Sequence, residues 1–229
     1  MKTIFFGVLV FLGAAAYCAA AGIAEQAREG NEKAEMSYAF GMVIATEFFL
    51  GSGIELNYGA FLRGFRDVME NRQTHHTIDQ AMDMIEAAFM SAHFEMAERN
   101  LAEGTAFLEE NAQRPGVLTT PSGLQIEVLV EGTGDMPDIS DVVLVHYHGT
   151  TIDGTVFDST VERGEPMELP LEWVIPGWSE GLRMMREGGK AILFIPPELA
   201  YGSEGAGAII GPNTTVIFEV ELIEIVRSE

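Results

Sequence analysis

The residues best suited to chemistry in this chain are aromatic side chains that lie beside turns in its second half. They are Tyr147, Phe157, Trp178, Tyr201 and Phe218. An apolar, aromatic pocket with few polar groups suits the binding or desolvation of a ligand more than acid–base chemistry. The sequence has neither a P-loop nor a Gly-x-Gly-x-x-Gly fingerprint, the patterns that bind nucleotide phosphates. We therefore expect a binding pocket that works without a cofactor.

The histidines do not form a metal-binding pattern. His146 and His148 would point the same way from a strand, but no third ligand accompanies them. We expect two solvent-facing imidazoles there. The other histidines considered lack a carboxylate or cysteine partner at ligand spacing, and we expect surface or capping roles for His75, His76 and His93. No metal is predicted.

Composition excludes some classes of partner. The chain has 229 residues, enough for one large domain or two small ones. Its 47% hydrophobic and 21% charged residues are typical of a folded protein. With 35 acidic against 13 basic residues the net charge is -22, which would repel a phosphate backbone. Nucleic acid is therefore not an expected partner.

The first residues resemble an export signal. Lys2 is followed by an apolar run over residues 4–16 and by small residues at 19–21, as at a signal-peptidase site. We predict a signal peptide over residues 1–22. Two alternatives stay open: acylation of Cys18, as in a lipoprotein, and retention of the uncharged stretch as a membrane anchor. Each would place the rest of the chain outside the cytoplasm, in the periplasm or at an outer membrane.

The single cysteine also limits the redox chemistry of the chain. Because Cys18 is the only one, an internal disulfide and a Cys-rich metal site are excluded.

The next segment has the pattern of helices. No proline occurs between residues 25 and 114, and breaks fall at 51–53 and 73–76. We predict helices over about 34–50, 57–71 and 78–112. The first is apolar nearly all round, and a helix without a polar face needs burial on several sides.

The third helix would form a long arm. It opens with a capping box from Thr77 to Gln80, and at 1.5 Å per residue it would span roughly 50 Å. A lone helix of this length, beside a segment too small to bury its own apolar surface, needs a second chain. We predict a homodimer through residues 23–76, with residues 77–116 as a linking helix. The methionines here could bind clients or a cofactor, but we favour packing at the subunit interface.

From residue 117 the pattern changes to that of strands. Alternation of apolar residues predicts strands over 124–130, 142–148, 155–159, 191–195 and 215–226, with one short helix over 178–185. The fold class is therefore α+β. Residues 117–229 would form an antiparallel β-sheet wrapped on one short helix.

The motifs of this domain resemble a known family. In order and spacing, they are similar to those of the FKBP-type peptidyl-prolyl cis-trans isomerases, which bind tacrolimus and rapamycin. The motifs are Val145-His146-Tyr147, residues 153–159 (DGTVFDS), 163–166 (RGEP), 174–181 (VIPGWSEG), Ile195-Pro196, 199–202 (LAYG) and 216–222 (VIFEVEL).

The helical segment resembles one group within that family. Residues 37–41 (SYAFG), 60–67 (AFLRGFRD) and 122–125 (SGLQ) are similar to the macrophage infectivity potentiator and FkpA group of exported bacterial isomerases. The resemblance implies a homodimer whose first helices interlock, with proline-containing polypeptides as clients. It also implies binding of tacrolimus- or rapamycin-type macrolides.

The resemblance also implies roles for residues of the pocket. Trp178 would be the floor under the proline ring, and Tyr147, Phe157, Val174, Ile175 and Phe218 would be its walls. Met167 and Ile210 would complete the substrate-binding surface.

Polar roles follow in the same way. Asp158 would orient Tyr147 or interact with the twisted carbonyl, and Arg163 would hold Asp158 ionised. Tyr201 would give its hydroxyl to the substrate backbone, and the Ile175 N–H would anchor the chain. Tyr147, Phe157, Asp158, Tyr201 and Phe218 are thus the expected catalytic residues. A non-catalytic exported chaperone or binding module is the alternative.

Some positions depart from the family pattern. Met167 stands where an aromatic residue is common, and Ala206 stands where several members have histidine. Gly211 replaces the first proline of a usual Ile-Pro-Pro. We expect these changes to affect macrolide affinity and residue preference more than activity.

Overall fold

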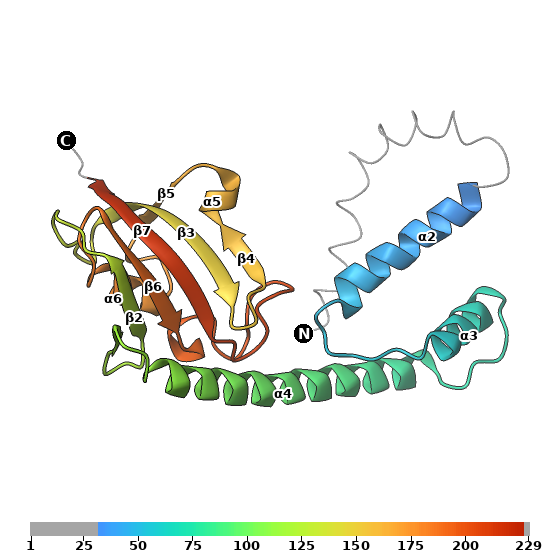
Figure 1. The fold of residues 1–229 in the computed structure, drawn as a ribbon. Coiled ribbons are helices and arrows are strands. Elements are labelled where there is room, and N and C mark those ends of the chain that lie inside the picture. The colour runs from blue at the N-terminus through green and yellow to red at the C-terminus, as the bar shows by residue number, and fades with distance from the viewer. Residues whose placement is uncertain (1–31, 227–229) are drawn as a thin grey trace. The chain divides into compact units, whose positions relative to one another are not determined.

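The computed structural model describes residues 32–226 (Figure 1), and the chain divides into two units, with the boundary in the sequence between Leu50 and Gly51. In the first unit, α2 (Glu32–Ile44) continues into a π-helix, η1 (Ala45–Phe49). The Leu50 N–H closes that last turn on the Ala45 carbonyl at 2.8 Å. The predicted signal peptide over residues 1–22, with Cys18, lies outside the described residues.

The next helix, α3 (Tyr58–Met69), is capped as its sequence dictates. Asn57 Oδ1 accepts a hydrogen bond from the Ala60 N–H at 2.9 Å. Its apolar residues recur at helical spacing and stay largely exposed in this chain: Phe61, Leu62, Phe65, Val68 and Met69.

The long helix α4 (Ile78–Asn111) begins at the predicted capping box. Thr77 Oγ1 accepts from the Gln80 N–H at 3.3 Å, and Gln80 Oε1 accepts from the Thr77 N–H at 3.0 Å. The helix has 34 residues and is continuous in Figure 1. Along the part of the chain that the structure describes, no helix combines the length and the apolar character needed to span a bilayer.

The second half of the chain forms one antiparallel sheet. Its strands are β1 (Val117–Thr119), β2 (Gln125–Val130), β3 (Val142–Thr151), β4 (Val156–Ser159), β5 (Met167–Pro170), β6 (Gly189–Ile195) and β7 (Val216–Val226). They lie in the order β1-β2-β6-β7-β3-β4. The edge of β3 that faces away from β7 pairs with two short strands, β5 along residues 142–145 and β4 along residues 148–150. The predicted antiparallel fold is therefore present.

Four short elements were absent from the sequence prediction. They are β1, β5, the helix α5 (Thr160–Arg163) and the 3-10 helix η2 (Pro197–Leu199). Elements of three or four residues are shorter than the window in which periodicity can be recognised. The predicted helix over 178–185 is α6 (Pro176–Leu182), which starts earlier because proline favours the first helical turn.

Helix α6 packs against one face of the sheet. Gly181 permits the close approach, because a Cβ atom there would lie 2.7 Å from Leu193 Cδ2 on β6. Side chains of β3 and β7 alternate between buried and more exposed positions, as expected when one sheet face covers a core. The largest fully buried side chains of this core are Leu124, Leu171, Leu182, Leu193, Ile195 and Leu222.

The C-terminal half of α4 packs against the sheet domain. Gln125 Nε2 donates to the Leu108 carbonyl at 2.8 Å, and buried Asn111 Nδ2 donates to Gln125 Oε1 at 2.7 Å. Phe107 and Phe194 have ring centroids 6.0 Å apart. Gly104 is buried against Thr215, and a Cβ atom at 104 would overlap the Thr215 hydroxyl and lie 3.2 Å from its Cβ.

We predict that Gly104→Ala destabilises the protein. Glycine inside a helix usually costs about 0.5–1 kcal/mol relative to alanine, so this substitution is ordinarily favourable. Here the added methyl group overlaps Thr215, and we expect the free energy of unfolding to fall by about 1–3 kcal/mol. Urea unfolding followed by the fluorescence of Trp173 and Trp178 measures the change.

A second substitution tests the cause. Thr215→Ala removes the overlapping hydroxyl and should restore most of the lost stability in the double variant. A Gly104→Ala protein as stable as the wild type would contradict the close approach of Gly104 to Thr215.

Candidate functional site

The aromatic residues singled out in the sequence lie together in the sheet domain. Phe218 on β7 is central, with its ring centroid 5.0 Å from Trp178, 5.3 Å from Phe157 and 6.0 Å from Tyr147. Trp178 and Tyr147 are themselves 5.0 Å apart, and all these contacts are T-shaped. Four separate elements, β3, β4, α6 and β7, thus supply one aromatic cluster.

The pairing of β3 with β7 creates the space for this cluster. Gly149 lies opposite Phe218 in the register. A Cβ atom at Gly149 would lie 2.7 Å from the Phe218 ring and 2.8 Å from the Phe157 ring. Sequence analysis did not identify Gly149 as part of the site. A glycine inside a strand pattern was the available signal, because it often marks close approach of another group.

The remaining pocket residues pack around the cluster. Ile210 belongs to the same buried hydrophobic core as Tyr147, Trp178 and Phe218, and Val174, Ile175 and Tyr201 pack against that core with their side chains partly buried. Tyr201 meets the Phe157 ring at 6.5 Å. Within the described residues, neither the Tyr201 hydroxyl nor the Ile175 N–H has a hydrogen-bond acceptor. Both donors are therefore available to a ligand.

The pocket floor carries another donor without an ordinary partner. Trp178 is 4% exposed, and its Nε1 makes no hydrogen bond to the described part of the chain. Its neighbours are the Tyr147 and Phe218 rings, so the floor of the pocket is almost entirely apolar. Such a surface suits a desolvated, apolar ring.

One side of the pocket carries a charged network. The Tyr147 hydroxyl donates a short hydrogen bond to Asp158, whose carboxylate also pairs with Arg163. Arg163 donates to the Tyr147 oxygen at 3.2 Å as well, and its guanidinium lies 5.8 Å from the Tyr147 ring centroid. Met167 Sδ is 3.9 Å from the same hydroxyl. The direct contact between Arg163 and Tyr147 was not foreseen from the sequence.

This network fixes the charge of Asp158. Partial burial acts to raise its pKa, but the hydrogen bonds from Tyr147 and Arg163 and the Arg163 charge outweigh burial, so the pKa lies below 3.8. Burial and the hydrogen bond to Asp158 raise the pKa of Tyr147 above 10.0. Burial and the Asp158 charge also raise the pKa of Tyr201. At neutral pH both tyrosines are neutral and the carboxylate is ionised.

The sequence analysis predicted solvent-facing imidazoles at His146 and His148, but in the structure both side chains are partly buried and have side-chain partners. His146 Nδ1 lies 3.1 Å from Thr160 Oγ1, and His148 Nδ1 lies 3.0 Å from Ser159 Oγ. Both rings are half-buried because β4 and α5 fold over this face of β3. Among residues 32–226, no group of three or more His, Cys, Asp or Glu side chains is placed to hold a metal.

A serine motif within α6 has a structural role and not a catalytic one. Residues 177–181 match Gly-x-Ser-x-Gly, the spacing of a hydrolase nucleophile. In the structure the Ser179 hydroxyl donates to the Leu171 carbonyl at 2.5 Å. This serine therefore connects α6 to the preceding loop and does not face the pocket as a free nucleophile.

Comparison with family models matches nearly the whole described chain. A model of FKBP-type peptidyl-prolyl cis-trans isomerases covers residues 133–223. A model of the domain amino terminal to FKBP-type peptidyl-prolyl isomerase covers residues 33–128.

Individual relatives are similar over most of their length. The FKBP-type 22 kDa peptidyl-prolyl cis-trans isomerase of Escherichia coli is 44% identical over 197 residues, which are 84% of this chain and 95% of the relative. The outer membrane protein MIP of Legionella longbeachae is 40% identical over 86% of this chain and 88% of its own. The crystal structure of FkpA from E. coli matches with a TM-score of 0.66 and 36% identity, covering 86% of this chain and 97% of that one. These matches confirm the predicted α+β fold.

We predict that Arg163→Gln raises the pKa of Asp158. The substitution removes the guanidinium charge and its hydrogen bonds, which lower the pKa of Asp158. Partial burial, which raises this pKa, is then less opposed. An NMR pH titration of the Asp158 carboxyl carbon measures the pKa. In Arg114→Gln, which breaks the ion pair with Glu127 instead, the Asp158 pKa should stay at its wild-type value.

The same shift has a defined effect on stability. Because the wild-type pKa is lower folded than unfolded, ionised Asp158 stabilises the fold above pH 3.8, and that contribution is lost as pH falls through the folded pKa. In Arg163→Gln this contribution should be smaller, and its loss should be complete at a higher pH than in the wild type. An unchanged Asp158 titration in this variant would contradict the assigned network.

Proposed function

The chain belongs to the FKBP-type peptidyl-prolyl cis-trans isomerases and acts on proline-containing polypeptides, and we propose that the aromatic cluster around Phe218 is its catalytic pocket. The observation that carries the proposal is the apolar cluster bounded by unused donors on Ile175 and Tyr201. Macrolides of the tacrolimus and rapamycin type would occupy the same pocket.

The reaction needs no nucleophile. An X-Pro bond isomerises over a barrier of about 20 kcal/mol because amide resonance is lost as the bond twists. Catalysis requires only that the pocket bind the twisted amide more tightly than the planar forms. Lowering the barrier by about 5.5 kcal/mol gives roughly four orders of magnitude in rate.

Each pocket residue has a role in this scheme. The proline ring would lie on Trp178, surrounded by Tyr147, Phe157, Val174, Ile175, Ile210 and Phe218. A twisted amide has lost its resonance and is more ketone-like, so an apolar surrounding favours it over the planar, more polar amide. The Ile175 N–H and the Tyr201 hydroxyl would hold the substrate backbone on either side.

The charged network would set the polar edge of the site. With Arg163 holding it ionised, Asp158 fixes the Tyr147 hydroxyl and presents negative charge beside the twisted carbonyl carbon. Met167 lies at the same edge and is 42% exposed. As a flexible side chain where an aromatic residue is common, it would widen the range of residues accepted before proline.

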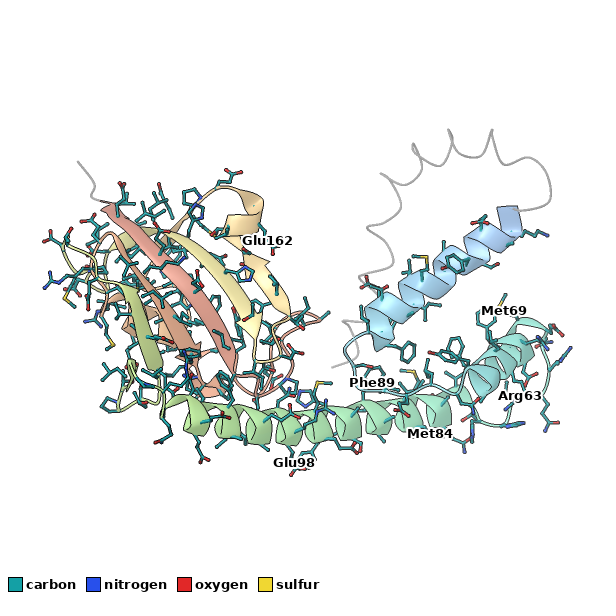
Figure 2. The ribbon with its side chains drawn as sticks, viewed as in Figure 1. Arg63, Met69, Met84, Phe89, Glu98 and Glu162 are labelled. Carbon is teal, nitrogen blue, oxygen red and sulfur yellow. The ribbon has the colours of Figure 1, made fainter. Side chains whose placement is uncertain are left out.

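We predict that Phe157→Ala and Asp158→Ala each lower kcat/KM for X-Pro tetrapeptides by about tenfold or more, which corresponds to at least 1.4 kcal/mol of transition-state stabilisation. A protease-coupled assay of cis–trans exchange measures the rate. Glu162→Ala is the matched control for the carboxylate, because Glu162 is an exposed carboxylate on α5 (Figure 2). Wild-type rates in the Phe157 and Asp158 variants would refute the site, and an inactive wild type would favour a non-catalytic binding module.

We further propose that the chain is a homodimer formed by residues 23–76. The support is the apolar face of α3, where Phe65 is 57% exposed and Val68 is 56% exposed in the single chain. The same face forms an apolar hollow with Ala60, Gly64 and Met69. Exposed apolar surface of this kind marks protein interfaces, and a second copy of the helix offers an equally apolar surface.

We predict that Phe65→Glu weakens the dimer by about thirtyfold or more, as for a buried interface residue. Arg63→Glu is the control, since Arg63 and the interface residue Met69 extend from different sides of α3 (Figure 2). Sedimentation of the full chain measures the assembly. A monomeric wild type, or a Phe65→Glu protein that dimerises as tightly as the Arg63→Glu control, would contradict the interface.

Finally, we propose that the protein works outside the cytoplasm and assists the folding of exported proteins. The support is the signal-like sequence of residues 1–22 and the similarity to a protein named as an outer membrane protein. Acylation of Cys18 would attach the mature chain to a membrane, whereas cleavage after it would release the chain.

A further inference from the structure

The loop between η2 (Pro197–Leu199) and β7 supplies one wall of the pocket. Ile210 is 6% exposed and packs into the buried cluster. A bridge fixes its backbone, since the Ala206 N–H donates to the Ile210 carbonyl at 2.7 Å and the Ile210 N–H donates back at 3.2 Å. Nothing in this bridge holds the segment that follows, residues 211–214.

Helix α4 holds that following segment. Asn100 Nδ2 donates to the Pro212 carbonyl at 2.8 Å and contacts Thr214 Oγ1 at 3.2 Å. Asn213 Nδ2 donates in the opposite direction, to the Ala97 carbonyl at 3.3 Å. The Thr214 hydroxyl in turn donates to the Gly211 carbonyl at 2.8 Å. The residue after Ile210 is thus linked to the helix through a short chain of hydrogen bonds.

Gly211 also packs closely against side chains of α4. A Cβ atom there would lie 2.9 Å from Met96 Sδ and 3.0 Å from Asn100 Nδ2. The backbone at Gly211 is not in the left-handed region, so conformational freedom does not explain the glycine. A larger residue at this position would have to displace the ends of the Met96 and Asn100 side chains. The departure from Ile-Pro-Pro is therefore consistent with the close approach of α4 to the pocket loop.

We propose that Asn100 is a positioning residue for the isomerase pocket, and that α4 fixes the position of Ile210 in the pocket wall. Asn100 touches no substrate and acts through Pro212, Thr214 and Gly211 on Ile210. The inference rests on the proposed pocket, in which Ile210 contacts the substrate. The long helix is then more than a spacer, because its C-terminal half shapes the site.

Isosteric substitution in the full chain tests this role. Asn100→Asp keeps the size of the side chain but replaces the donor with an oxygen that faces the Pro212 carbonyl. We expect kcat/KM for X-Pro peptides to fall by about threefold to tenfold, the effect of losing one or two modest hydrogen bonds. The loss should lie mainly in KM, since the charged network of Asp158 is untouched. Asn100→Ala should act in the same direction.

The matched control is Glu98→Gln on the same helix. Glu98 is exposed and extends from α4 away from the sheet (Figure 2). The change exchanges a carboxylate and an amide, as Asn100→Asp does in reverse. We expect wild-type kcat/KM for this variant.

Hydrogen exchange separates positioning from catalysis. In Asn100→Asp the amides of Ala206 and Ile210 should exchange faster, while those of Leu193 and Val220 in the core strands keep their protection. Wild-type activity, measured alongside, shows separately whether the proposed function holds. Unchanged exchange at Ile210, unchanged kcat/KM, or an equal effect of Glu98→Gln would each overturn the proposal.

Discussion

The pairing of β3 with β7 is the interaction on which the rest of the sheet domain depends. It runs from Val142 opposite Val226 to Thr151 opposite Val216. Since side chains alternate along both strands, a slip of one residue in either strand would move its pocket residue, Tyr147 on β3 or Phe218 on β7, to the outer face. The register also sets Gly149 against Phe218, the contact that leaves room for the rings.

The other functional groups are attached to this pair. β4 and β5 share the free edge of β3 and carry Phe157, Asp158 and Met167 to one end of the pocket. β6 lies on the other side of β7 and receives α6, whose Trp178 forms the floor. An apolar pocket beside one ionised carboxylate results, and this combination suits a reaction that changes the polarity of an amide without breaking a bond.

The helices differ in how much of their apolar surface the single chain covers. α3 and the first half of α4 expose apolar side chains such as Phe65 and Met82, which a single chain does not cover. The second half of α4 is different, because Gly104 and Asn111 are buried against the sheet domain. One helix therefore has an end with exposed apolar side chains and an end fixed to the sheet domain.

Much of the fold was predictable because it is recorded locally. The capping box at Thr77, the alternation along β3 and β7, and the change of period near Pro115 each depend on neighbours in the chain. The motif around Trp178 indicated the family in the same way. The short elements β1, β5 and α5 were not predictable, because three or four residues show no period.

The sequence by itself determined the longer helices and strands, the apolar and acidic character of the chain, and the residue types available to a pocket. Only the tertiary structure decided how they meet. It showed that His146 and His148 bind the α5 turn, that Arg163 reaches Tyr147, and that Gly149, Gly104 and Gly211 are sites of close approach. The reason is physical: periodicity records which face of an element is apolar, whereas the space beside an atom depends on segments far away in the chain.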